Sequence, residues 1–105
     1  MNIGIIGSGG REHAICFKLK QSKQVKNLYC IPGNAGTSGI CENINIEFKD
    51  FEKLYEIVLN KKIELLIIGP EVPLVNGITD FFEKKRLKFL VQVKKHLNLK
   101  ALKLL

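Results

Sequence analysis

The amino-acid sequence predicts an α/β fold built on an open parallel sheet of about four strands. Short apolar runs alternate with helix-like segments of about ten residues, and this order produces right-handed β–α–β units. One of these runs, IELLII at residues 63–68, is almost continuously apolar, which is typical of a parallel strand covered on both faces.

The first half of the chain supplies two of the strands. Residues 2–6 form a short apolar strand, and residues 11–22 carry apolar side chains at the spacing of a helix that packs on a sheet. Residues 28–31 form the second strand, which ends at PGNAG. Apolar and polar residues alternate over 44–48, so we expect a short edge strand there.

The second half supplies the other two strands. Asp50 is the expected N-cap of a helix over residues 51–59. The strand at 63–68 is followed by the loop GPEVPLVNG, by a third helix over 78–85, and by a fourth strand from 86 to about 91.

The formal net charge of +7 is unevenly distributed along the chain. Residues 1–83 hold nine Lys or Arg and all ten acidic residues, whereas residues 84–105 hold eight Lys or Arg and no acidic residue. A generally basic chain would favour nucleic acid or an anionic surface as its partner. Because the basic character belongs to the tail alone, we expect no nucleic-acid partner for the domain.

Nothing in the sequence indicates a membrane or secreted protein. It has no apolar run of about 18 residues, and its start lacks the cationic and apolar regions of a signal peptide. Cys16, Cys30 and Cys41 lack the paired spacing of a zinc or redox motif. We therefore expect free thiols in a cytoplasmic protein, with no metal site, no catalytic cysteine and no membrane partner.

Three unusual loops follow three of the predicted strands: GSGGREH at 7–13, PGNAGT at 32–37 and GPEVPL at 69–74. Parallel strands end at one edge of a sheet, where α/β proteins bind their ligands, so we expect these loops to meet there. Glycines allow the backbone to approach a ligand closely, and the amides at a helix start favour phosphate. Ser8 adds a hydroxyl and Arg11 a charged fork, so this edge is predicted to bind a phosphate-bearing ligand.

The ligand is expected to be smaller than a nicotinamide dinucleotide. Gly7 and Gly9 match the start of the dinucleotide fingerprint, but Glu12 stands where its third glycine belongs. The acidic residue that would bind the ribose is replaced by Pro32 and Gly33 at the end of the second strand. Tight turns without any ligand are the alternative, which explains one such loop more easily than three.

The motifs GSGGREHA, PGNAGT and IGPEVPLVNGITDFF resemble those of phosphoribosylamine–glycine ligase, the glycinamide ribonucleotide synthetase of purine synthesis and an ATP-grasp enzyme. The resemblance covers residues 1 to about 88. It implies that residues 1–88 form the Rossmann-like, pre-ATP-grasp amino-terminal domain of that family.

The resemblance also implies a reaction and a site. ATP activates the carboxylate of glycine as an acyl phosphate, and the amine of 5-phosphoribosylamine attacks it; the domain resembled here helps to hold the phosphoribosyl substrate. The implied substrate-binding residues are Gly7, Ser8, Gly9, Gly10, Arg11 and Glu12 in the first turn, Gly33, Asn34, Ala35, Gly36 and Thr37 in the second, and Gly69, Pro70 and Glu71 in the third.

Two of the polar residues in these motifs have open roles. Glu71 is a candidate for binding the ribose hydroxyls or the amine, with a solvated or helix-capping role as the alternative. His13 is either a packed histidine or a general base.

The sequence offers no counterpart to the rest of such an enzyme. Phosphoryl transfer from ATP requires metal and cationic clamps, and no candidate lysines or acidic magnesium ligands are present. Although the family uses ATP with magnesium or manganese, we expect this chain to bind none of them, to hold no catalytic residue and not to catalyse alone. A separately encoded ATP-grasp portion is a potential partner. A non-enzymatic module that binds a phosphorylated ligand or a partner, and a product without function, are the alternatives.

Residues 89–105 depart from the family pattern. With one choice of codons for FLVQVKKHLNLKALKLL, reading one base earlier gives IFGPSKKASKFEGSKAF, which contains the family landmarks IFGP and EGSKAF. We therefore expect an aberrant, frameshifted tail. The rival interpretation is a basic amphipathic helix for a membrane or nucleic acid, because apolar residues recur there at helical spacing.

Overall fold

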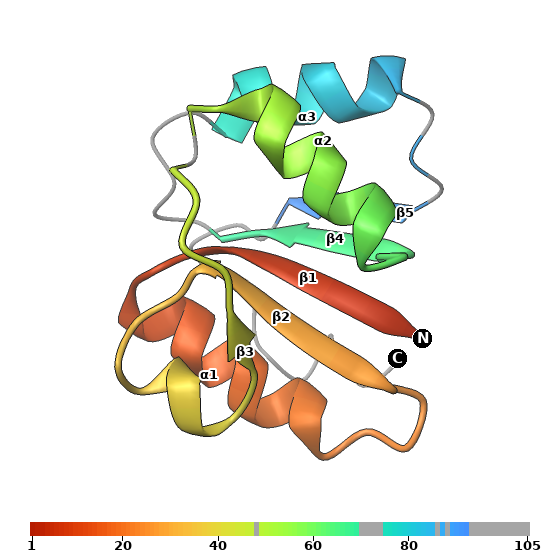
Figure 1. Cartoon of the computed structure of the whole chain (residues 1–105). Helices are drawn as coiled ribbons and strands as arrows, with labels where there is room; N and C mark the ends of the chain where they lie inside the picture. Colours follow the sequence, from red (N-terminus) through yellow and green to blue (C-terminus); the bar gives the residue numbers. More distant parts are fainter. Residues whose placement is uncertain (48, 70–74, 86, 88, 93–105) are drawn as a thin grey trace.

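A parallel sheet of five strands runs through the centre of the molecule (Figure 1). The computed structural model describes residues 1–47, 49–69, 75–85, 87 and 89–92. The strand order is β3-β2-β1-β4-β5, and every neighbouring pair is parallel. The strands are β1 (Asn2–Gly7), β2 (Asn27–Pro32), β3 (Glu42–Asn43), β4 (Leu65–Ile68) and β5 (Phe89–Gln92).

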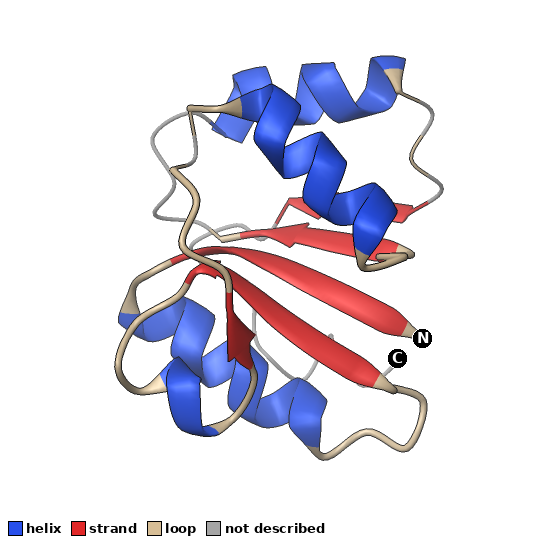
Figure 2. Ribbon diagram, viewed as in Figure 1, coloured by secondary structure: helices blue, strands red, loops and turns tan. Residues whose placement is uncertain are grey.

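Helices cover both faces of this sheet (Figure 2). On one face lie α1 (Gly10–Lys20) and the short 3-10 helix η1 (Thr37–Gly39), and on the other lie α2 (Phe51–Asn60) and α3 (Val75–Lys84). Asp50 caps α2, since its Oδ1 accepts a hydrogen bond from the Lys53 amide at 3.2 Å. Among the described residues, no helix is long and apolar enough to cross a membrane.

The strands are apolar on both sides because both sides are buried. Ile3 and Ile5 of β1 face α1, where they pack with Ile15 and Leu19, whereas Ile6 faces α2 and α3. The second layer of the core includes Leu54, Val58, Ile68, Ile78 and Phe82. This two-sided burial is what the uninterrupted apolar runs predicted.

The α/β fold and the four strands expected from the sequence are confirmed, but the edge strand differs in place. It consists of Glu42 and Asn43 rather than residues 44–48. The Ile44 amide still donates to the Cys30 carbonyl at 2.8 Å, and the Ile46 amide then turns back to the Ile44 carbonyl at 2.9 Å. The alternation arises because Ile44 and Ile46 pack against the core under α2, not because they continue a strand. Phe48 lies outside the described residues.

The last strand pairs in parallel with β4, with Leu90 opposite Leu66. It therefore contains the first four residues of the predicted aberrant tail. Residues 93–105, which carry the rest of that tail and the proposed amphipathic pattern, lie outside the described residues.

Candidate functional site

The ends of β1, β2 and β4 meet at one edge of the sheet, and their turns are joined there by backbone hydrogen bonds. The Gly33 amide, after β2, donates to the Gly7 carbonyl at 3.1 Å. The Gly69 amide, after β4, donates to the Ile6 carbonyl at 2.9 Å. The start of the third turn, Gly69, thus lies beside the first two turns as predicted, and the rest of that turn, 70–74, is outside the described residues. This edge is also where the strand order reverses about β1, the place at which open α/β sheets form a ligand crevice.

The first turn leads directly into α1, and its backbone is accessible. Gly9 is the N-cap of the helix, and Ser8 and Gly10 are exposed at its start. The first backbone amides of a helix have no partner within it, and the helix dipole places partial positive charge there. The turn therefore offers hydrogen-bond donors to an anion.

Asn34 ties the second turn to the first. Its Nδ2 donates to the Ser8 carbonyl at 2.8 Å and to the Gly9 carbonyl at 3.3 Å, while its Oδ1 accepts from the Thr37 amide at 2.9 Å. A single side chain thus orients the carbonyls of one turn and closes the other.

Thr37 and Asn43 hold the second turn from below. Thr37 is fully buried, and its hydroxyl accepts from the Asn34 amide at 2.8 Å and lies 2.7 Å from Asn43 Oδ1. Asn43 Nδ2 donates to the Asn34 carbonyl at 2.8 Å. Gly33 is required in this turn, because its φ is 76° and a Cβ there would overlap the Asn43 side chain. The network makes the second turn a rigid part of the edge.

Glu12 lies beneath the turns rather than on their outer wall. It is 0% exposed, and its Oε2 accepts a hydrogen bond from the Gly9 amide at 3.2 Å. A Cβ added at Gly7 or at Gly69 would overlap its carboxyl group. In this position it braces the first and third turns against each other. Its predicted contact with the substrate stays a prediction.

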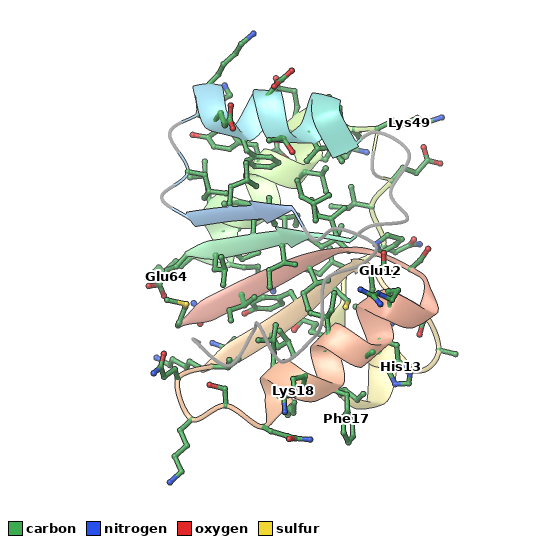
Figure 3. All side chains as sticks on the ribbon, turned by 180° about the vertical axis from the view of Figure 1, so that it is seen from behind. Glu12, His13, Phe17, Lys18, Lys49 and Glu64 are labelled. Atoms are coloured by element: carbon green, nitrogen blue, oxygen red, sulfur yellow. The ribbon has the colours of Figure 1, made fainter. Side chains whose placement is uncertain are left out.

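The other predicted residues divide between the edge and its surroundings. Arg11 is half-buried in the first turn of α1, while Ala35 and Gly36 are exposed. His13 is half-buried against the second turn, since a Cβ on Gly36 would lie 2.9 Å from His13 Cε1. His13 therefore lies beside the second turn, and its role, as a packed histidine or a general base, stays a prediction. Figure 3 shows Glu12 and His13 on the same end of α1. Pro70 and Glu71 lie outside the described residues.

Comparison with known proteins connects the chain to one family. The family model "Phosphoribosylglycinamide synthetase, N domain" matches residues 1–99. The chain belongs to this family.

Individual relatives of this synthetase N domain agree. The chain is 50% identical over 95 residues to a phosphoribosylamine–glycine ligase of Caldanaerobacter subterraneus, covering 90% of this chain and 23% of that protein. It is 38% identical over 105 residues to the ligase of Synechocystis, covering 98% and 25%. A crystal structure of the ligase from Thermotoga maritima matches 65% of this chain and 15% of that one, with a TM-score of 0.50 and 35% identity. The chain thus spans about a quarter of the length of these curated relatives.

Sequence reasoning missed two features of this synthetase N domain. Asn43 holds the second turn through its hydrogen bond to the Asn34 carbonyl, but it lies nine residues after Asn34 and belongs to none of the three motifs. Cys16, Cys30 and Cys41 are free thiols as predicted. Their sulfur atoms nevertheless all lie within 4.8 Å of one another, which their spacing in the sequence does not indicate.

The three thiols perturb one another. The hydrogen bond between Cys16 and Cys30 raises the pKa of Cys16 and lowers the pKa of Cys30. Burial, followed by the nearby Cys30, raises the pKa of Cys41 to about 12.

Proposed function

We propose that this chain forms part of the phosphoribosyl-binding site of a phosphoribosylamine–glycine ligase, which joins glycine to 5-phosphoribosylamine with ATP. The observation that carries the proposal is the edge at which three glycine turns are joined by the Gly33 and Gly69 amides. Family membership and the names of the relatives support it.

The phosphate group is proposed to bind at the start of α1. Backbone amides near Gly10, the exposed Ser8 hydroxyl and the positive end of the helix dipole would face it. The Gly36 side of the second turn, held by Asn34, would face the ribose. The third turn would complete the site through Pro70 and Glu71.

Catalysis is proposed to need groups that this chain does not supply. Carboxylate activation requires ATP and magnesium or manganese held by charged side chains, and we assign both to the ATP-grasp portion of the enzyme. That portion is the proposed partner, in the cytoplasm. By this proposal the chain alone binds a substrate fragment without turning it over.

The tail from residue 89 is proposed to result from a frameshift. The nucleotide sequence tests this directly: an open frame that starts one base earlier and encodes the ATP-grasp region should follow. A gene whose downstream sequence encodes nothing of the kind would refute it.

Ribose 5-phosphate is a stable probe of the proposed site. We expect it to bind in a calorimetric titration and to be displaced by millimolar inorganic phosphate. Ser8→Asp places a negative charge at the exposed start of α1 and should weaken binding about tenfold or more, by charge repulsion. Asn60→Asp adds the same charge at the exposed end of α2 and should leave binding unchanged. Equal loss in both variants, or no binding by the folded chain, would contradict the proposal.

A complementation assay separates an enzyme component from a binding module. The chain is mixed with the Caldanaerobacter ligase from which the matched region has been deleted. Restored formation of glycinamide ribonucleotide supports the ligase assignment. Binding of ribose 5-phosphate without restored ligation favours the alternative, a non-enzymatic module for phosphorylated ligands.

A further inference from the structure

We propose that Cys16, Cys30 and Cys41 form a three-sulfur site for one thiophilic cation, with Cu(I) as the preferred ion. The three thiols come from three separate segments of the chain. Cys16 lies on α1, Cys30 on β2, and Cys41 between η1 and β3. All three sulfur atoms lie within 4.8 Å of one another, although 14 and 11 residues separate them along the chain.

The spacing of the sulfur atoms fits a shared ion after a small adjustment. Three sulfurs around one ion at about 2.3 Å each lie about 4 Å apart. Cys41 Sγ is already 3.8 Å from Cys16 Sγ, and Cys16 Sγ is 2.7 Å from Cys30 Sγ. Binding of a shared ion would require one side chain of the buried Cys16–Cys30 pair to rotate, so that their sulfur atoms move about 1 Å further apart.

The donor set selects the class of ion. Thiolates alone favour soft cations such as Cu(I) and Zn(II). Zn(II) in proteins is almost always tetrahedral and would need a fourth ligand. Two oxygens accept the Cys41 thiol: the Thr37 carbonyl at 3.3 Å, and Asn43 Oδ1 at 4.0 Å, which also accepts from the Thr37 hydroxyl. No fourth His, Cys, Asp or Glu of the described residues joins the three sulfurs, and such a set suits a three-coordinate ion.

The site is enclosed and has an entrance. Cys16 and Cys30 are 0% exposed and belong to the apolar layer under α1, with Ile15 and Leu28. Cys41 is half-buried and lines a surface pocket of about 310 Å³. An ion that enters through this pocket meets Cys41 first and is then shielded from water by the apolar layer.

The test is a Cu(I) titration of the reduced full chain under anaerobic conditions, in competition with a chromogenic Cu(I) chelator. We expect one Cu(I) per chain, with thiolate-to-metal charge-transfer absorption. Cys41→Ser removes one ligand at a half-buried position and should lower the affinity by at least about tenfold. The control His13→Ala removes a histidine of the same helix that does not belong to the cluster, and it should leave the affinity for Cu(I) unchanged.

Two further measurements keep the outcome decisive. Thermal unfolding of the same samples should show a rise in Tm with Cu(I) that Cys41→Ser loses. Cys30→Ala serves as the second variant, and circular dichroism of each apo variant establishes that it is folded. A parallel titration with Zn(II) is expected to give weaker binding.

Three results would overturn the proposal. The first is a wild-type chain that takes no Cu(I) from the chelator, and the second is a folded Cys41→Ser chain that binds as tightly as wild type. The third is tight binding of Zn(II) in preference to Cu(I), which would require a fourth ligand.

Discussion

The carboxyl group of Glu12 occupies the space in which a side chain on Gly69 would have to lie. Glu12 belongs to the first turn of α1, and Gly69 follows β4, so this contact joins two of the three turns that form the edge of the sheet. The same carboxyl group accepts the Gly9 amide through Oε2. One buried side chain therefore sets both the start of the helix and the distance between the turns.

Gly69→Ala should destabilise the domain by about 1–3 kcal/mol, because the added methyl group overlaps a buried side chain. Gly39→Ala is the matched control, since a Cβ there meets nothing within 4 Å. Urea unfolding followed by circular dichroism measures both.

A double-mutant cycle tests whether the overlap with Glu12 causes the destabilisation by Gly69→Ala. In a Glu12→Ala background the penalty of Gly69→Ala should shrink by about 1 kcal/mol or more, because the overlapping atoms are gone. An unchanged penalty would show that the methyl group clashes with something else.

Asn34→Asp should lower the free energy of unfolding by about 1–2 kcal/mol. The new side chain still accepts from the Thr37 amide, but it cannot donate to the Ser8 and Gly9 carbonyls. Asn45→Asp makes the same chemical change at an exposed position and should stay within about 0.5 kcal/mol. The two unfolding midpoints are compared in one buffer. Equal midpoints would mean that the Asn34 side chain contributes nothing to the joining of the turns.

Thr37 allows a comparison of nearly isosteric side chains. Thr37→Val removes the hydroxyl that accepts from the Asn34 amide and donates to Asn43 Oδ1. Both partners then lose this hydrogen bond, and the free energy of unfolding should fall by about 2 kcal/mol. Thr37→Ser keeps the hydroxyl and should cost less, despite removing a buried methyl group. Hydrogen exchange of the Asn34 amide should accelerate in Thr37→Val only. A larger loss in Thr37→Ser would show that packing outweighs the hydrogen bonds.

The sequence allowed the strands and the shared edge to be predicted, because burial on both faces leaves a continuous apolar run and parallel strands end on one side. The orientation of Glu12 could not be predicted in this way. It lies in a glycine motif like its neighbours, but as the third helical residue it reaches back to the Gly9 amide and faces the sheet. The contacts of Asn43 and of the three cysteines could not be predicted either, because they join segments that are distant in the sequence and local patterns contain no information on how such segments pack.

A comparison of the buried Phe82 with the exposed Phe17 measures how much the second layer of the core stabilises the domain. Phe82 of α3 is fully buried, and its ring centroid lies 6.4 Å from that of Tyr55 on α2 and 5.3 Å from that of Phe81. Phe17, in contrast, is 59% exposed and points away from the sheet (Figure 3). Phe82→Ala should cost about 3–5 kcal/mol, through lost burial and the cavity that remains. Phe17→Ala removes the same atoms from a largely solvated site and should change the free energy of unfolding by less than about 1 kcal/mol. Similar losses in both variants would indicate that another surface covers Phe17 in solution, which sedimentation of the two proteins would then reveal.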